Sequence, residues 1–110
     1  MSHITITPEA AVLTARAGQT TLGQTQGALR LQEGSYPPVL YVPREDIDMD
    51  LLVKSGRTTT CPHKGIASYY AVKTPEGLLE NAVWSYETPI AQVAAIKGYL
   101  AFYPDKISLT

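Results

Sequence analysis

The residues best suited to chemistry lie together in one stretch, residues 58–70. Within four positions it holds the chain's only cysteine, Cys61, one of its two histidines, His63, and a lysine, Lys64. A thiol reacts as its thiolate, which a neighbouring cation favours. One hypothesis therefore makes Cys61 a nucleophile and His63 its base, and it predicts rapid alkylation of the thiol. The alternative is a structural Cys61, because free cysteine is among the most frequently buried residues.

Lys64 and Gly65 suggest a ligand-binding turn. Lysine offers a cation for a phosphate or carboxylate, and glycine lets the backbone approach a ligand closely. Arg44 and Arg57 are further candidate cations, provided that the fold brings them near, and Arg44 is included in the predicted site. The alternative is that Lys64 is solvated and that Gly65 only shapes the turn.

An unusual set of aromatic residues points to a binding wall. The chain has seven tyrosines and one phenylalanine, and a buried tyrosine hydroxyl needs a hydrogen-bond partner. Trp84 and Tyr86 share one face of the strand expected over residues 78–86, and Tyr69 lies on the expected partner strand. These three residues predict a wall for a flat ligand or a cation. Ordinary core packing is the alternative.

No metal site is expected. Cys61 and His63 supply at most two ligands, whereas a structural zinc site commonly uses four. Asp46, Asp48 and Asp50 alternate, but the glycine and terminal glutamate of a calcium loop are missing. The same aspartates are the candidates for the magnesium ligands of a nucleotide-transfer enzyme, although helix capping explains some of them. No cofactor follows from these residues.

The elements that position these residues are mainly strands. Short runs of β-prone residues alternate with glycine- and proline-containing turns every 8–12 residues or so. Residues 66–72 and 78–86 form the clearest hairpin, and residues 54–57 are expected to be a turn. The pattern predicts a single, mainly β domain of about eight short strands, as found in small β sandwiches, barrels or bent sheets.

One short helix is expected near residues 89–97. Thr88 suits the N-cap, Pro89 the first helical position and Gly98 a left-handed stop. A single helical turn capped by Asp46 or Asp48 is also expected.

Composition narrows the range of partners. The 110 residues carry a net charge of −1, with lysines and arginines scattered, so we expect no nucleic-acid partner. No apolar run approaches the roughly 20 residues that span a membrane, and the N-terminus lacks the features of a signal peptide. With one cysteine there is no intramolecular disulfide, and a cytoplasmic location is the expectation.

Four separated motifs occur in order between about Arg30 and Ile107. They are Tyr41-x-Pro43-x-x-Asp46, Cys61-Pro62-x-Lys64-Gly65-x-Ala67-x-Tyr69, Trp84-x-Tyr86-x-x-Pro89 and Gly98-x-x-Ala101-Phe102-Tyr103. In this combination they resemble the domain-of-unknown-function 427 family. The resemblance implies a compact fold of bent antiparallel sheets, the β-tent. It carries a loose nucleotidyltransferase-like label but no established activity.

These observations favour a module that binds a small molecule or peptide between Cys61–Gly65 and the aromatic wall. Lys64 would hold an anionic group and the aromatic residues a planar one. Two alternatives stay open. One is an enzyme, either cysteine-dependent or nucleotidyltransferase-like. The other is a structural or interaction domain that forms a homodimer through residues 99–103 or the N-terminal hairpin.

Overall fold

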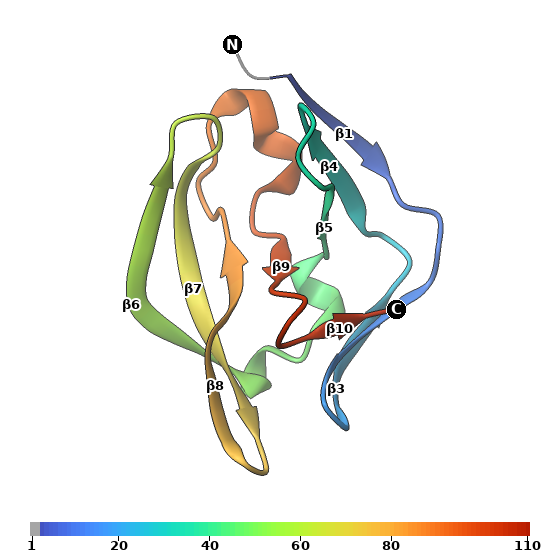
Figure 1. The fold of residues 1–110 in the computed structure, drawn as a ribbon, viewed down its shortest axis with the longest axis vertical. Helices are drawn as coiled ribbons and strands as arrows, with labels where there is room; N and C mark the ends of the chain where they lie inside the picture. Colours follow the sequence, from blue (N-terminus) through green and yellow to red (C-terminus); the bar gives the residue numbers. More distant parts are fainter. Residues whose placement is uncertain (1–2) are drawn as a thin grey trace.

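A computed structural model describes residues 3–110, and these residues form three antiparallel sheets (Figure 1). Met1 and Ser2, part of the stretch considered above for a signal peptide, lie outside the described residues. The first sheet contains β1 (Ile4–Pro8), β4 (Leu29–Glu33) and β5 (Val39–Tyr41). The second contains β2 (Leu13–Ala17), β3 (Thr20–Thr25) and β10 (Ser108–Leu109). The third contains β6 (Leu52–Cys61), β7 (Gly65–Thr74), β8 (Gly77–Ser85) and β9 (Leu100–Phe102).

The first two sheets are consecutive parts of one long, bent hairpin. Its arms are β1–β2 and β3–β4, and between the sheets the Glu9 amide still donates to the Ala28 carbonyl. The first and third sheets meet at Val42 and Leu100, whose amides and carbonyls exchange two hydrogen bonds of 2.8 Å. In Figure 1, β6, β7 and β8 therefore lie along one side and β1, β3 and β4 along the other.

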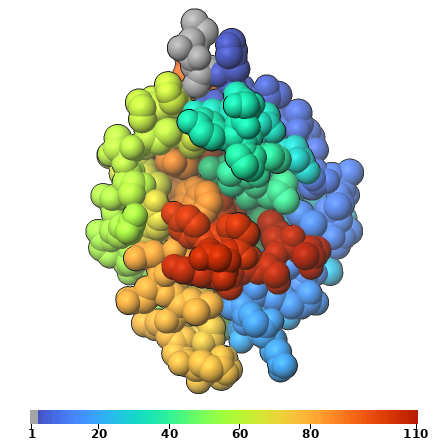
Figure 2. All heavy atoms as spheres, viewed as in Figure 1, coloured from blue at the N-terminus to red at the C-terminus, as the bar shows by residue number. Residues whose placement is uncertain are grey.

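The pairing of β9 bears on one predicted dimer interface. β9 is hydrogen-bonded to β8 on one side, and its Leu100 bridges to Val42 on the other. All three of its residues are buried. Figure 2 shows the C-terminal residues packed in the middle of one face, between the strands β6–β8 and the N-terminal strands. Both edges of the chain at Leu100 are thus paired within the described residues, and a homodimer through residues 99–103 or the N-terminal hairpin stays a prediction.

Two clusters of apolar side chains make up the core. One includes Leu22, Val72, Val83, Leu100 and Ile107. The other is rich in aromatic groups, because Tyr41, Tyr69 and Tyr86 are buried in it and Trp84 and Tyr103 pack against it. Burial of this surface is the main force that holds the sheets together.

The fold class predicted from the sequence is confirmed, and so is the hairpin of residues 66–72 and 78–86, which is β7–β8. The turn expected over residues 54–57 is wrong, because β6 continues through it. Its pairing with β7 shifts between Lys54 and Thr58, so the extra residues form a bulge. Inside the bulge the Arg57 amide donates to Ser55 Oγ at 3.2 Å, which replaces a lost ladder bond.

The predicted helical turn near Asp48 is confirmed as the 3₁₀ segment η2 (Met49–Leu51), in which Asp48 accepts a bond from the Asp50 amide. It follows another 3₁₀ turn, η1 (Arg44–Asp46). The helix expected near residues 89–97 is a 3₁₀ segment, η3 (Ala91–Ile96), with a kink at Val93 and no side-chain cap. Its entry is fixed by a different contact, in which the Ile90 amide donates to the Lys64 carbonyl at 3.0 Å.

Candidate functional site

A cleft of about 270 Å³ lies between β4–β5 of the first sheet and β7–β8 of the third. It unites four of the residues predicted to bind a ligand, namely Lys64, Tyr69, Trp84 and Tyr86. The other lining residues include Leu31, Glu33, Tyr36, Tyr41 and Tyr103. The predicted residues Cys61, His63, Gly65 and Arg44 are not part of this lining.

Strand register creates the aromatic wall of the cleft. Tyr69 and Trp84 are direct partners in the β7–β8 pair, so their side chains emerge on the same face. Tyr103 follows β9 and packs on the indole of Trp84, with ring centroids 4.6 Å apart. Tyr41 meets the same indole edge-on at 6.5 Å. The orientation of the tryptophan is therefore set by tyrosines that come from other parts of the fold.

An ion pair forms the polar part of the cleft. Lys64 Nζ, in the β6–β7 turn, lies 2.7 Å from Glu33 Oε1 at the end of β4, and the side chains are only 13% and 19% exposed. Burial lowers the pKa of Lys64, but the hydrogen bond to Glu33 and the nearby negative charge raise it, and the net pKa lies above its usual value. The ammonium is thus charged and already neutralised by a carboxylate, which disfavours the prediction that Lys64 alone holds an anion.

Gly65 has a structural explanation. The Lys64 amide donates to the Cys61 carbonyl at 3.2 Å, which closes the turn, and Gly65 follows at φ +118°. A Cβ placed on Gly65 would lie 3.4 Å from both Pro89 Cα and the Thr88 carbonyl oxygen. Residues 88–90 of the chain therefore lie against Gly65, and a ligand-binding role for Gly65 stays a prediction.

Cys61 and His63 lie on either side of Pro62 at the β6–β7 turn. Cys61 is half-buried and packs against the aromatic core cluster. Among residues 3–110 no hydrogen bond joins the Cys61 thiol to the His63 ring. The nucleophile hypothesis for these two residues stays a prediction.

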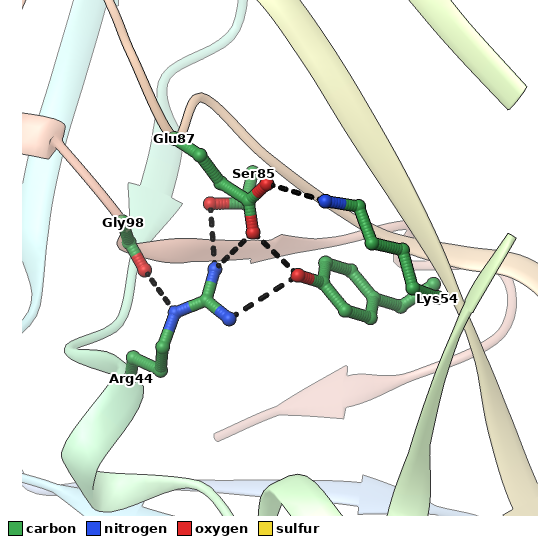
Figure 3. Close-up of polar contacts among 6 residues, drawn as sticks. Arg44, Lys54, Ser85, Glu87 and Gly98 are labelled. Atoms are coloured by element: carbon green, nitrogen blue, oxygen red, sulfur yellow. Dashed lines mark hydrogen bonds and ion pairs between the residues drawn. The ribbon is translucent and has the colours of Figure 1, made fainter. Parts of the chain in front are cut away.

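Arg44 is held in a separate polar network (Figure 3). Its guanidinium donates to four acceptors, which are the Gly98 carbonyl at 3.0 Å, the Tyr70 hydroxyl at 3.2 Å, Ser85 Oγ at 3.2 Å and Glu87 Oε2 at 3.0 Å. Gly98 has φ +74°, the left-handed conformation expected for it. These contacts tie η1 to the third sheet, so Arg44 is placed to stabilise the fold rather than to contact a ligand in the cleft.

Glu87 is the centre of charge in this network. Lys54 Nζ lies 2.8 Å from its Oε1, and the Tyr70 hydroxyl also donates to the carboxylate. Burial raises the pKa of Glu87, but the hydrogen bonds from Lys54 and Tyr70 and the positive charges of Lys54 and Arg44 outweigh this and lower it to about 2. The carboxylate is therefore ionised throughout the physiological range.

Two of the three aspartates considered for metal binding have hydrogen-bond partners within the fold. Asp46 Oδ2 accepts from Thr25 Oγ1 at 2.8 Å, and Asp48 caps η2. In the part of the chain that the structure describes, no three His, Cys, Asp or Glu side chains group as metal ligands would. Nor does any helix between residues 3 and 110 have the length and apolarity needed to cross a membrane.

Sequence reasoning missed Glu33 as a site residue. Its partner is 31 positions away, and no local pattern links the two. Tyr41 and Tyr103 belong to the aromatic set, but the sequence did not assign them to the wall because they reach it from other sheets or strands. The excess of tyrosine over phenylalanine was the signal that could have included them.

Comparison with known proteins identifies the family. No curated protein matches the chain. The family model described as "Domain of unknown function (DUF427)" matches residues 5–110, nearly the whole chain. The match begins well before the four motifs that carry the resemblance. The chain therefore belongs to the DUF427 family.

Proposed function

We propose that this protein binds a small, planar molecule in the cleft, with the ring against Trp84 and Tyr103. The edge of the ligand would carry a hydrogen-bond donor beside an acceptor and would meet the Lys64–Glu33 pair. The observation that supports this most directly is that one cleft of about 270 Å³ combines a largely buried ion pair with an aromatic wall.

The aromatic wall supports a flat ligand. Rings packed at 4.6–6.5 Å present apolar faces and hydroxyl groups together, which is how small-molecule sites commonly combine affinity with orientation. The volume lies near the lower end of ligand sites, about 300–1,000 Å³, so a compact ring system fits better than a folded peptide.

The ion pair supports a neutral ligand edge. Lys64 offers hydrogen-bond donors only, and ionised Glu33 offers acceptors only. A simple anion would have to compete with Glu33 for Lys64, and a simple cation would have to compete with Lys64 for Glu33. An amide-like edge, such as that of a pyrimidine base or an aromatic amide, satisfies both side chains without breaking their pairing.

Isothermal titration with four probes tests the proposal. Uracil and benzamide carry the neutral edge, whereas benzoate and benzylamine carry one charge each. We expect the neutral probes to bind about tenfold or more tightly than the charged ones, which corresponds to about 1.4 kcal/mol. Trp84→Ala and Glu33→Gln should weaken the neutral probes, whereas Glu9→Gln, which breaks the exposed Glu9–Arg30 pair, should not.

Two results would contradict the proposal. One is that neither neutral probe binds. The other is that Trp84→Ala leaves their affinity unchanged in a protein that still melts cooperatively. A charged probe that binds as well as uracil would remove the neutral-edge part of the proposal.

A further inference from the structure

A second hollow, of about 310 Å³, shares two lining residues with the aromatic cleft and is lined by two cationic side chains. Its polar lining consists of Arg57, Asn81, Asp105 and Lys106. Tyr69 and Tyr103 line both the hollow and the cleft. We propose that this hollow is the subsite for an anionic group, a phosphate ester or a carboxylate, on the ligand whose ring occupies the cleft. The inference rests on the proposed function for the ring and adds a class of substituent to it.

Arg57 is the main candidate for holding the anion. Its guanidinium carbon lies 4.9 Å from the centre of the Tyr69 ring, a cation–π contact that leaves the edge of the guanidinium group for hydrogen bonds. Within residues 3–110, no carboxylate lies within ion-pair distance of Arg57. Arg44, by contrast, already has four acceptors. A planar guanidinium can bind two oxygens of a phosphate or carboxylate at once.

The bulge in β6 explains why Arg57 is available. Residues 55–57 fall between the two paired parts of β6, so Arg57 is not fixed in the ladder with β7. Its amide is held locally by Ser55 Oγ, and Ser55 also donates to Asn81 Oδ1 at 3.3 Å. Bulges commonly redirect a side chain next to a functional site.

Lys106 supplies a second cation beside the other shared tyrosine. Its Nζ lies 5.9 Å from the centre of the Tyr103 ring and donates one bond of 3.0 Å to the Glu80 carbonyl. An ammonium group has three donors, so this contact leaves donors for a ligand. Asp105 also lines the hollow, and its single negative charge is outweighed by the two cations.

The two tyrosines connect ring and anion sites. Their rings stack at 6.5 Å with an angle of 13° between the planes, and Thr59 Oγ1 lies 2.9 Å from the Tyr69 hydroxyl. Burial raises the pKa of Tyr69, but hydrogen bonds with Thr59 and Tyr103 and the charge of Arg57 lower it below its usual value. Of these causes, the charge of Arg57 is the one that would also act on an anionic group placed beside the wall.

The test compares uridine with two derivatives that carry an anionic group at the 5′ position, uridine 5′-monophosphate and uridine-5′-carboxylic acid. Affinities for the full chain are measured by isothermal titration at low and high salt. We expect the anionic derivatives to bind about tenfold tighter than uridine at low salt. Arg57→Gln should remove most of this advantage and leave uridine unchanged. Lys106→Gln should reduce it less, and Arg57→Lys should retain part of it.

Matched controls are Arg16→Gln and Lys73→Gln, which remove exposed cations on β2 and β7. Neither should change the advantage of the anionic derivatives. If only the monophosphate gains affinity, the subsite takes a phosphate ester; if both derivatives gain, it takes either anion.

The outcomes separate the two proposals. Equal affinities for uridine and both anionic derivatives would overturn the subsite and leave the ring site standing. An anionic advantage that survives in both Arg57→Gln and Lys106→Gln would also overturn the subsite. If uracil, benzamide and uridine do not bind but inorganic phosphate does, in an Arg57-dependent manner, the subsite stands and the ring site fails. If none of these probes, the uridine derivatives or phosphate binds, both fail.

Discussion

The Lys64 ammonium lies 2.7 Å from the Glu33 carboxylate, and this pair joins the β6–β7 turn to the end of β4 at one wall of the aromatic cleft. Both side chains are largely buried, so each depends on the other for compensation of its charge. The pair presents donors and acceptors side by side rather than a single charge, and the neutral ligand edge proposed above rests on this arrangement.

Glu33→Gln should lower the pKa of Lys64. Burial, which lowers this pKa, would remain, whereas the charge and the ionic hydrogen bond that raise it would be lost. NMR titration of ¹³C-methylated lysines can follow the change, with Glu9→Gln as a control that should leave Lys64 unaffected. The same variant should bind benzoate more tightly than the wild type does, since Lys64 would have no carboxylate partner. A Lys64 pKa that stays the same or rises would contradict this account.

Arg44→Met should destabilise the protein without weakening ligand binding. It removes four hydrogen-bond donations and leaves Glu87 and Ser85 with fewer partners, so we expect a loss of about 2–4 kcal/mol in the free energy of unfolding. Urea unfolding measures this loss, and Arg16→Met, at an exposed site, should change stability by no more than about 0.5 kcal/mol. Loss of uracil binding in folded Arg44→Met protein would contradict this prediction and would indicate that Arg44 contributes to the ligand site.

Glu87 should make stability depend on pH in the acid range. Its pKa of about 2 in the folded protein lies below the usual 4.5, so its contribution is complete above about pH 4.5 and is lost as pH falls towards 2. Its side chain is 30% exposed, and after allowance for solvent screening we expect the contribution to be about 1–2 kcal/mol. Glu87→Gln should flatten the dependence of unfolding free energy on pH in this window, whereas exposed Glu76→Gln should not. Parallel curves for wild type and Glu87→Gln would count against the network.

Local sequence signals were sufficient for much of the fold. Glycine and proline mark the hairpin turns, and period-two alternation places Trp84 and Tyr86 on one face. The signals failed where tertiary pairing overrode local preference. Ser55-Gly56 resembles a turn, yet a long β7 partner keeps β6 extended around a bulge. Capping residues favoured an α-helix, yet η3 is shaped by the Ile90–Lys64 backbone bond and by burial of Val93 and Ile96.

The residues of the candidate site also divide into those that the sequence could bring together and those that it could not. Tyr69 and Trp84 could be paired from the sequence because a hairpin makes them neighbours. Glu33 and Tyr103 could not, because they come from strands whose pairing depends on the whole fold. The choice between the two arginines was also beyond the sequence: Arg44 begins a 3₁₀ turn and is enclosed by acceptors, whereas Arg57 lies in a bulge beside Tyr69.

Cys61 alkylation distinguishes a structural thiol from a nucleophile. The side chain is half-buried against the aromatic cluster, and the nearby Lys64 cation is paired with Glu33. We therefore expect iodoacetamide to react at least about tenfold more slowly with the folded protein than with the urea-unfolded chain, because reaction requires a thiol accessible to the reagent. Reaction that is faster in the folded state, and is slowed by His63→Ala, would support the nucleophile hypothesis.

Gly65 and Gly77 form a natural pair for separating backbone strain from crowding. Their φ angles are +118° and +120°, but only at Gly65 would an added Cβ have neighbours within 4 Å, namely residues 88–90. Alanine should therefore cost about 1–3 kcal/mol at either site, because the strain is the same and the contacts at Gly65 are ordinary van der Waals distances. Leucine should cost at least about 1 kcal/mol more at Gly65 than at Gly77, since it must displace the segment that enters η3. Urea unfolding of the four variants measures both effects. Equal costs for leucine at the two sites would mean that residues 88–90 can move aside at little cost. A ligand could then also be accommodated beside Gly65.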